Sequence, residues 1–195
     1  ITIYLLMTYS VSIDIGGTTF SFVIFNNKKV FYKSECYDIL KYSHFSDFIR
    51  KLSELILEQV QDIEKIGVAC PGPLDIETCE IFNTPNLKIL QYVNIRKELQ
   101  KYINCKNIYI ENDANAYALG SYYRLENKKI TDVMVGITLG TGIGLGIIIN
   151  GKLFRGSYGM AGEYEFAPIS ENLRWANLNG FRFFKQKTKE ILEKL

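Results

Sequence analysis

The sequence has 195 residues, of which 47% are hydrophobic and 23% charged, and its formal net charge at pH 7 is +2. A chain of this length can bury a sizeable core, and because its charges are spread out, its composition gives no reason to expect nucleic-acid binding. The four cysteines show neither a close pair nor a metal-ligand spacing, so we expect reduced, mostly buried thiols in a cytoplasmic protein. The apolar stretch 1–6 is too short to span a bilayer and has no basic flank, which argues against a membrane anchor.

The first part of the chain predicts a mixed sheet with a helical cover. Short β-branched or alternating apolar patterns, typical of strands, occur at 9–15, 20–25, 30–33, 65–69 and 107–110. Apolar residues recur at helical spacing over 45–60 and 93–102, and a further helix is predicted from Asp113 to about Tyr123. Three neighbouring strands, a helix and a returning strand predict an α/β fold.

The second part of the chain repeats the opening pattern. Strands are predicted at 132–138, 145–149 and 152–154, again as strand, glycine turn, strand, hairpin and strand. This echo suggests a second lobe built like the first. From Gly180 onward, apolar residues fall on one face of a predicted amphipathic helix.

Asp14-Ile15-Gly16-Gly17-Thr18-Thr19 joins the first two predicted strands. Glycines allow the backbone N–H groups to approach an anion closely, and the two threonine hydroxyls add donors, so this turn suits phosphate. Asp14 is placed to hold Mg²⁺ through water. The alternative is an ordinary Asp-initiated hairpin in which the glycines serve only the turn.

A second glycine-rich segment spans 136–146. It lacks the G-x-G-x-x-G spacing and continues into a strand instead of opening a helix, which argues against a dinucleotide site. Gly140, Thr141 and Gly142 instead form a candidate second phosphate turn. The alternative is a glycine-rich hairpin or bulge without a ligand.

Asp113 follows a predicted strand and opens a predicted helix. The helix N-terminus favours an ionised carboxylate, which is suited to accept a proton from a hydroxyl group. Asn112 would orient that hydroxyl by hydrogen bonding. An N-cap role for Asp113 is the alternative, and the two roles are compatible.

These motifs together resemble the ROK family of bacterial sugar kinases and sugar-responsive repressors, within the actin-like ATPase superfamily. The matching segments, in order along residues 9–168, are Asp14–Thr18, Glu111-Asn112-Asp113-Ala114-Asn115-Ala116, Gly140–Gly144 and Gly159–Glu163. The resemblance implies an actin-like, ribonuclease H-like two-lobe α/β fold. Its lobes would be residues 1–113 and 114–195, with the second lobe incomplete relative to the usual family length.

The resemblance also implies ATP-dependent phosphorylation of a hexose or N-acetylhexosamine hydroxyl, with ATP and Mg²⁺ as cofactors and Asp113 as the general base. The sugar would be held by Gly72, Asn86, Asn112, Asp113 and Glu163. The phosphates would be held by Asp14 through Mg²⁺, and by Gly16, Gly17, Thr18, Thr19, Gly140, Thr141 and Gly142.

The family's zinc motif is not matched. Its Ile-Gly-His segment is replaced here by Tyr164-Glu165-Phe166, and its cysteine positions fall on Arg174, Ala176 and Phe181, so no zinc site is expected. These differences and the length suggest one alternative to a kinase, a catalytically impaired relative that binds sugar without turnover. The repressor branch of the family suggests a second, a sugar-responsive regulator. Homodimerisation is expected if the apolar face of the tail helix needs a partner.

Overall fold

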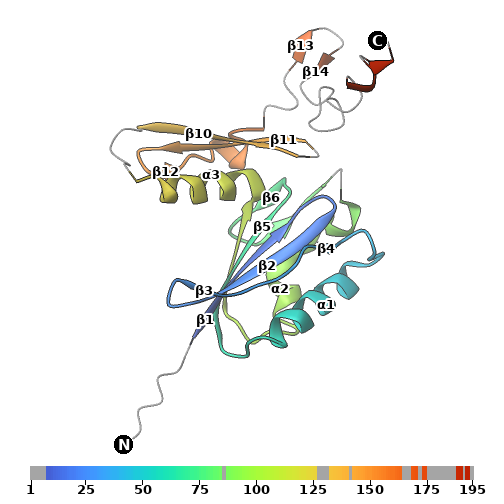
Figure 1. Ribbon diagram of the computed structural model, residues 1–195, viewed down its shortest axis with the longest axis vertical. Helices are drawn as coiled ribbons and strands as arrows, with labels where there is room; N and C mark the ends of the chain where they lie inside the picture. Colours follow the sequence, from blue (N-terminus) through green and yellow to red (C-terminus); the bar gives the residue numbers. More distant parts are fainter. Residues whose placement is uncertain are drawn as a thin grey trace, which may run out of the picture. The chain divides into compact units, whose positions relative to one another are not determined.

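The computed structural model describes residues 8–84, 87–126, 132–140, 142–163, 168–170, 173–174, 188–190 and 192–193. The chain divides into two compact units, Ile1–Asp113 and Ala114–Leu195. Each unit is built on its own β-structure (Figure 1).

The first unit contains a mixed sheet with the strand order β3-β2-β1-β5-β9, and β4 pairs with β2. Its strands are β1 (Tyr9–Ile15), β2 (Thr19–Asn26), β3 (Lys29–Lys33), β4 (Tyr37–Asp38), β5 (Ile63–Cys70) and β9 (Asn107–Asn112). β1 runs antiparallel to β2 but parallel to β5, and β5 runs parallel to β9. The parallel ends of β1, β5 and β9 therefore meet at one edge of the sheet.

One face of this sheet forms the core. Alternate residues of β1 such as Ile13, and of β2 such as Phe22, are fully or almost fully buried there. The helices α1 (Phe45–Leu57) and α2 (Ile95–Leu99) contribute to the same buried cluster, and both lie on one side of the sheet in Figure 1. Phe48 of α1 packs edge-on against Phe20, with ring centroids 5.1 Å apart. The regular spacing of apolar residues in the predicted strands and helices of this unit thus corresponds to burial in one shared core.

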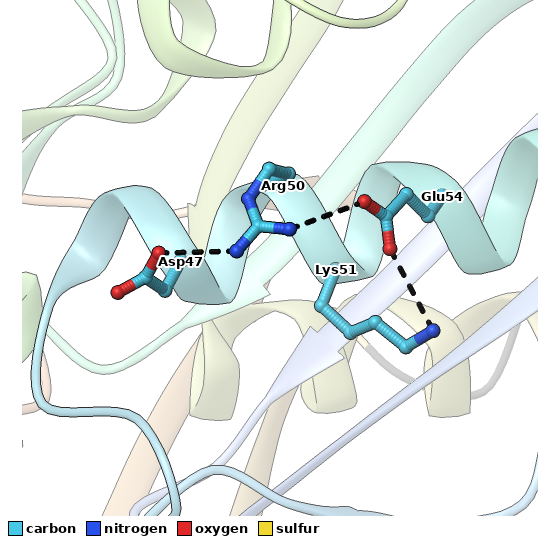
Figure 2. A network of polar contacts seen from close by, with 4 residues as sticks. All are labelled: Asp47, Arg50, Lys51 and Glu54. Atoms are coloured by element: carbon cyan, nitrogen blue, oxygen red, sulfur yellow. Dashed lines mark hydrogen bonds and ion pairs between the residues drawn. The ribbon is translucent and has the colours of Figure 1, made fainter.

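The solvent face of α1 carries a chain of ion pairs, shown in Figure 2. Arg50 contacts Asp47 at 3.2 Å and Glu54 at 3.4 Å, and Lys51 contacts Glu54 at 3.6 Å. All four side chains are exposed, so solvent screens these pairs and each contributes little to stability. Burial of the opposite face is what fixes this helix.

A small antiparallel sheet lies between β5 and α2 in the sequence, with the order β6-β7-β8. Its strands are β6 (Leu74–Asp75), β7 (Glu80–Ile81) and β8 (Val93–Asn94). The helix predicted over 93–102 is therefore shorter than expected, because its first two residues are β8. Asn94 begins α2 as its N-cap, with its side chain accepting a hydrogen bond from the Lys97 N–H at 3.0 Å.

The second unit pairs a helix with an antiparallel sheet of order β10-β11-β12. The strands are β10 (Val133–Leu139), β11 (Ile143–Ile149) and β12 (Lys152–Leu153), as the repeated sequence pattern predicts. The helix α3 (Asp113–Arg124) buries Ala118 and Tyr122 with Ile148 of β11.

Two further short strands of the second unit, β13 (Pro168–Ser170) and β14 (Leu173–Arg174), pair with each other. Residues 188–190 are helical, and most of the predicted tail helix lies outside the described residues. In the part of the chain that the structure describes, none of the helices has the length and apolar character needed to cross a membrane.

Candidate functional site

Three parallel strands of the first unit end at the same edge, and polar residues follow each of them. Asp14 on β1 is in register with Ala69 on β5, and Ala69 is in register with Glu111 on β9. Neighbouring strands lie about 4.8 Å apart, so these residues form one row across three strands. Ligands of sheets with parallel strands bind at the carboxyl ends of the strands. This edge is the candidate site.

The turn after β1 is closed by a hydrogen bond from the Gly16 N–H to the Thr19 carbonyl at 2.8 Å. A Cβ on Gly16 would lie 3.3 Å from that same oxygen, while the φ of Gly16 is outside the left-handed region. Close approach, and not an unusual dihedral angle, is therefore what favours glycine here.

Within the described residues, the backbone N–H groups of Gly17 and Thr18 donate no hydrogen bond. The side chains of Thr18 and Thr19 are exposed. Two amides and two hydroxyls are thus accessible to an acceptor-rich ligand at this turn.

Asp14 lies beside this turn with an exposed side chain. Partial desolvation by the surrounding sheet and turn nevertheless raises the pKa of its carboxyl above the ordinary value of 3.8. Desolvation disfavours the ionised form of this carboxyl, and a bound cation would offset that cost.

Gly72 and Asn112 lie side by side at the ends of β5 and β9. A Cβ placed on Gly72 would lie 3.5 Å from the side-chain nitrogen of Asn112, and the peptide bond between Gly72 and Pro73 is cis. Asn112 is also in register with Cys70, the last residue of β5. These two predicted sugar-binding residues are therefore neighbours, whereas Asn86 lies outside the described residues.

Asp113 is the first residue of α3, directly after the last residue of β9. Burial raises the pKa of the nearby Cys70 thiol most, and the charges of Asp113, Cys79 and Glu111 raise it further. Asp113 and Glu111 thus lie within electrostatic range of the same buried thiol. The site edge combines a hydrogen-bonding amide, a glycine and carboxylates.

In the second unit, the hairpin between β10 and β11 is closed by the Gly140 N–H, which donates to the Gly142 carbonyl at 2.9 Å. Thr141 lies outside the described residues. The neighbouring glycines have a different role, because Gly136, Gly144 and Gly146 all face α3. These three glycines lie in β10 and β11, so the candidate phosphate turn stays the predicted segment 140–142.

Glu163 follows a compact segment anchored on β11. Gly162 has a φ of +91°, and a Cβ there would collide with the Leu145 carbonyl oxygen. The Ala161 N–H donates to the Arg155 carbonyl at 2.9 Å, and the Glu163 N–H donates to the Met160 carbonyl at 3.2 Å. Gly162 therefore packs closely against Leu145 of β11, immediately before Glu163.

Among the described residues, His, Cys, Asp and Glu side chains nowhere gather in threes as a metal-ligand group. The altered zinc motif at 164–166, together with positions 176 and 181, lies outside those residues.

The ROK family model matches residues 10–173. The chain belongs to the ROK family. This confirms the resemblance carried by the motif order.

Two ROK relatives differ in what they do. A glucokinase of Thermotoga maritima is 34% identical over 165 residues, which cover 83% of this chain and 51% of the relative. A xylose repressor of Caldicellulosiruptor bescii is 39% identical over 124 residues, covering 64% of this chain and 30% of the repressor. The chain thus spans about half the length of the glucokinase it matches.

Among solved structures, a ROK glucokinase from Streptomyces griseus in complex with glucose and AMPPNP superposes with a TM-score of 0.70 and 25% identity. The match covers 83% of this chain and 51% of that one. The mixed α/β architecture is therefore that of ROK proteins, in the actin-like ATPase class, over about half their length.

Proposed function

We propose that the protein carrying this chain transfers the γ-phosphate of ATP to a hydroxyl of a hexose or N-acetylhexosamine. The observation that supports this most is the juxtaposition of Asp14, Gly72, Asn112 and Asp113 at one edge of the first unit's sheet. Similarity to the glucokinase supports the same reaction class.

Asp113 is proposed as the general base. It would take the proton of the sugar hydroxyl, whose oxygen then attacks the γ-phosphorus as the bond to the ADP oxygen breaks. Asn112, Gly72, Asn86 and Glu163 would position the sugar. Such transfers depend mainly on positioning and charge stabilisation, so a fixed carboxylate matters more than an unusually strong base.

The residues of the first turn fit MgATP. The Gly17 and Thr18 amides, together with the hydroxyls of Thr18 and Thr19, are donors for phosphate oxygens. Asp14 would hold Mg²⁺ through water, and the ion would supply charge neutralisation on the phosphates. Gly140, Thr141 and Gly142 are proposed as the second phosphate turn. No zinc ion is assigned a role.

The xylose repressor supports a second candidate, a sugar-responsive regulator that binds sugar without phosphorylating it. A catalytically impaired kinase relative would behave in the same way towards sugar. Both alternatives predict that the protein binds sugar without any response to ATP. Calorimetry with sugar and with ATP therefore distinguishes them from a kinase.

The test is a coupled ADP-release assay on the protein encoded by the full reading frame, against a panel of hexoses and N-acetylhexosamines. We expect sugar-dependent turnover, and a loss of at least about a hundredfold in kcat for Asp113→Asn, because general-base catalysis contributes about 10²–10⁴-fold. Asp62→Asn is the matched control, since Asp62 is exposed at the opposite end of the sheet. Full turnover by Asp113→Asn, or none by the wild type, rejects the proposal.

We also propose a cytoplasmic location, where ATP is available, and a homodimer. Light scattering coupled to size-exclusion chromatography checks the second point, and a monomer at all concentrations contradicts it.

A further inference from the structure

The row of residues at the site edge contains a carboxylate, that of Glu111, which has no role in the proposed reaction so far. The Glu111 side chain folds back so that its Oε1 accepts a hydrogen bond from the Asn112 N–H at 3.1 Å. Glu111 is half-buried and lies on the sheet face opposite the core, in the same row as Asp14 and Ala69.

This hydrogen bond lies at the junction where β9 ends and α3 begins. It ties the side chain of Glu111 to the peptide group that joins Glu111 to Asn112, so it limits rotation of that group. The next residue is Asp113, the first of α3. Asn112 and Asp113 are the two residues that directly follow this constrained peptide group.

We propose that Glu111 is a positioning residue, whose carboxylate fixes the junction between β9 and α3 so that Asn112 and Asp113 present their side chains to the acceptor sugar. The inference rests on the proposed function for its effect on catalysis, but the hydrogen bond itself is a property of the folded chain. In its hydrogen bond to the Asn112 N–H, Glu111 acts as an acceptor, a role that an uncharged oxygen can also fill.

Two substitutions separate these properties. Glu111→Gln keeps an oxygen acceptor and removes the charge, whereas Glu111→Ala removes both. We expect Glu111→Ala to lower kcat by about tenfold or more, because small misplacements of reacting groups are costly, while KM for sugar and ATP changes by less than about threefold. Glu111→Gln should retain kcat within about threefold of the wild type.

The matched control is Glu64→Ala. Glu64 is an exposed glutamate at the start of β5, and its side chain also accepts a hydrogen bond, from Thr8 at 3.2 Å. It lies at the opposite end of the sheet from the site. Its removal should leave both kcat and KM unchanged.

Amide hydrogen exchange at Asn112 provides a second measurement that does not depend on turnover. The amide should exchange faster in Glu111→Ala than in the wild type or in Glu111→Gln, when each protein is measured equally far below its own unfolding midpoint. Unchanged exchange in Glu111→Ala overturns the inference even if the wild type shows no kinase activity. In an active enzyme, the inference is also overturned if Glu111→Ala keeps full kcat, or if Glu111→Gln loses as much as Glu111→Ala.

Discussion

Gly146 of β11 lies directly against Ala118 of α3: a Cβ on Gly146 would come within 2.5 Å of the Ala118 Cβ and 2.6 Å of the Ala114 carbonyl oxygen. Gly136 faces Ala118 in the same way, at 2.7 Å. Helix α3 therefore approaches the hairpin to a distance that only glycine permits. The helix that begins at Asp113 is held in place by this contact.

Gly146→Ala should destabilise the protein by about 1–3 kcal/mol, because the added methyl group overpacks the contact between helix and sheet. Urea unfolding followed by circular dichroism measures the change. The matched control is Gly120→Ala on the same helix, where a Cβ would have no atom within 4 Å. That exposed helical position should gain stability, by up to about 1 kcal/mol. Equal effects of the two substitutions would contradict the packing argument.

The main elements were predictable because each buries one face with a regular period. The strand predicted at 9–15 and the helix predicted from Asp113 agree with β1 and α3. The family match then confirmed the fold class, which rests on motif order more than on any single turn.

Other features depend on contacts between distant residues and could not be read locally. β6, β7 and β8 have two residues each, too short for a periodic signal. The packing role of the glycines at 136 and 146 had no local signal, since their helical partner Ala118 is far away in the sequence. Alanines spaced four apart in α3 were the available signal of close packing. The side-chain role of Glu111 had no sequence signal.

The cysteines should differ sharply in reactivity. Cys36 is exposed, whereas the other three thiols are buried, as expected from the sequence: Cys70, Cys79 and Cys105. Burial also raises the pKa of each buried thiol, which lowers its thiolate fraction. Brief iodoacetamide treatment at pH 8, followed by peptide mass spectrometry, should label Cys36 alone until denaturant is added. Labelling of Cys70 at the rate of Cys36 would contradict this, and Cys36→Ser should abolish the fast phase.

Asp75 should stabilise the loop between β6 and β7 in a pH-dependent way. Its Oδ1 accepts hydrogen bonds from the Glu77 N–H at 2.8 Å and the Thr78 N–H at 3.1 Å. These bonds, with Thr78 as the larger cause, lower the pKa of Asp75 below its ordinary 3.8. The stabilisation is therefore present above that value and is lost as the pH falls through the lowered pKa.

Asp75→Ala should accordingly be less stable than the wild type at pH 7, and the difference should shrink below about pH 4. Urea midpoints across this range measure it. Asp62→Ala serves as the control, since it changes an exposed aspartate outside this turn. A difference that stays constant with pH would mean that the hydrogen bonds do not favour the ionised carboxylate.

The pKa of Asp14 is shifted in the opposite direction to that of Asp75. Desolvation raises the pKa of its carboxyl above 3.8 in the folded protein, so the folded state binds the proton more tightly than the unfolded chain does. Ionisation of Asp14 therefore lowers the stability of the folded protein as the pH rises from the ordinary pKa through the raised pKa. The full destabilisation is present above the raised pKa. Asp14→Asn should be more stable than the wild type at pH 7, and the gain should vanish as the pH approaches 3.8.

The same substitution should abolish the Mg²⁺-dependent turnover of the proposed kinase, since the amide carries no charge to hold the ion. A residue that costs stability while serving a ligand is typical of a functional site. Adding MgATP should raise the unfolding midpoint of the wild type and not that of Asp14→Asn. If Asp14→Asn is less stable at pH 7, or is stabilised by MgATP as much as the wild type, Asp14 is a structural residue of the turn and not the cation ligand.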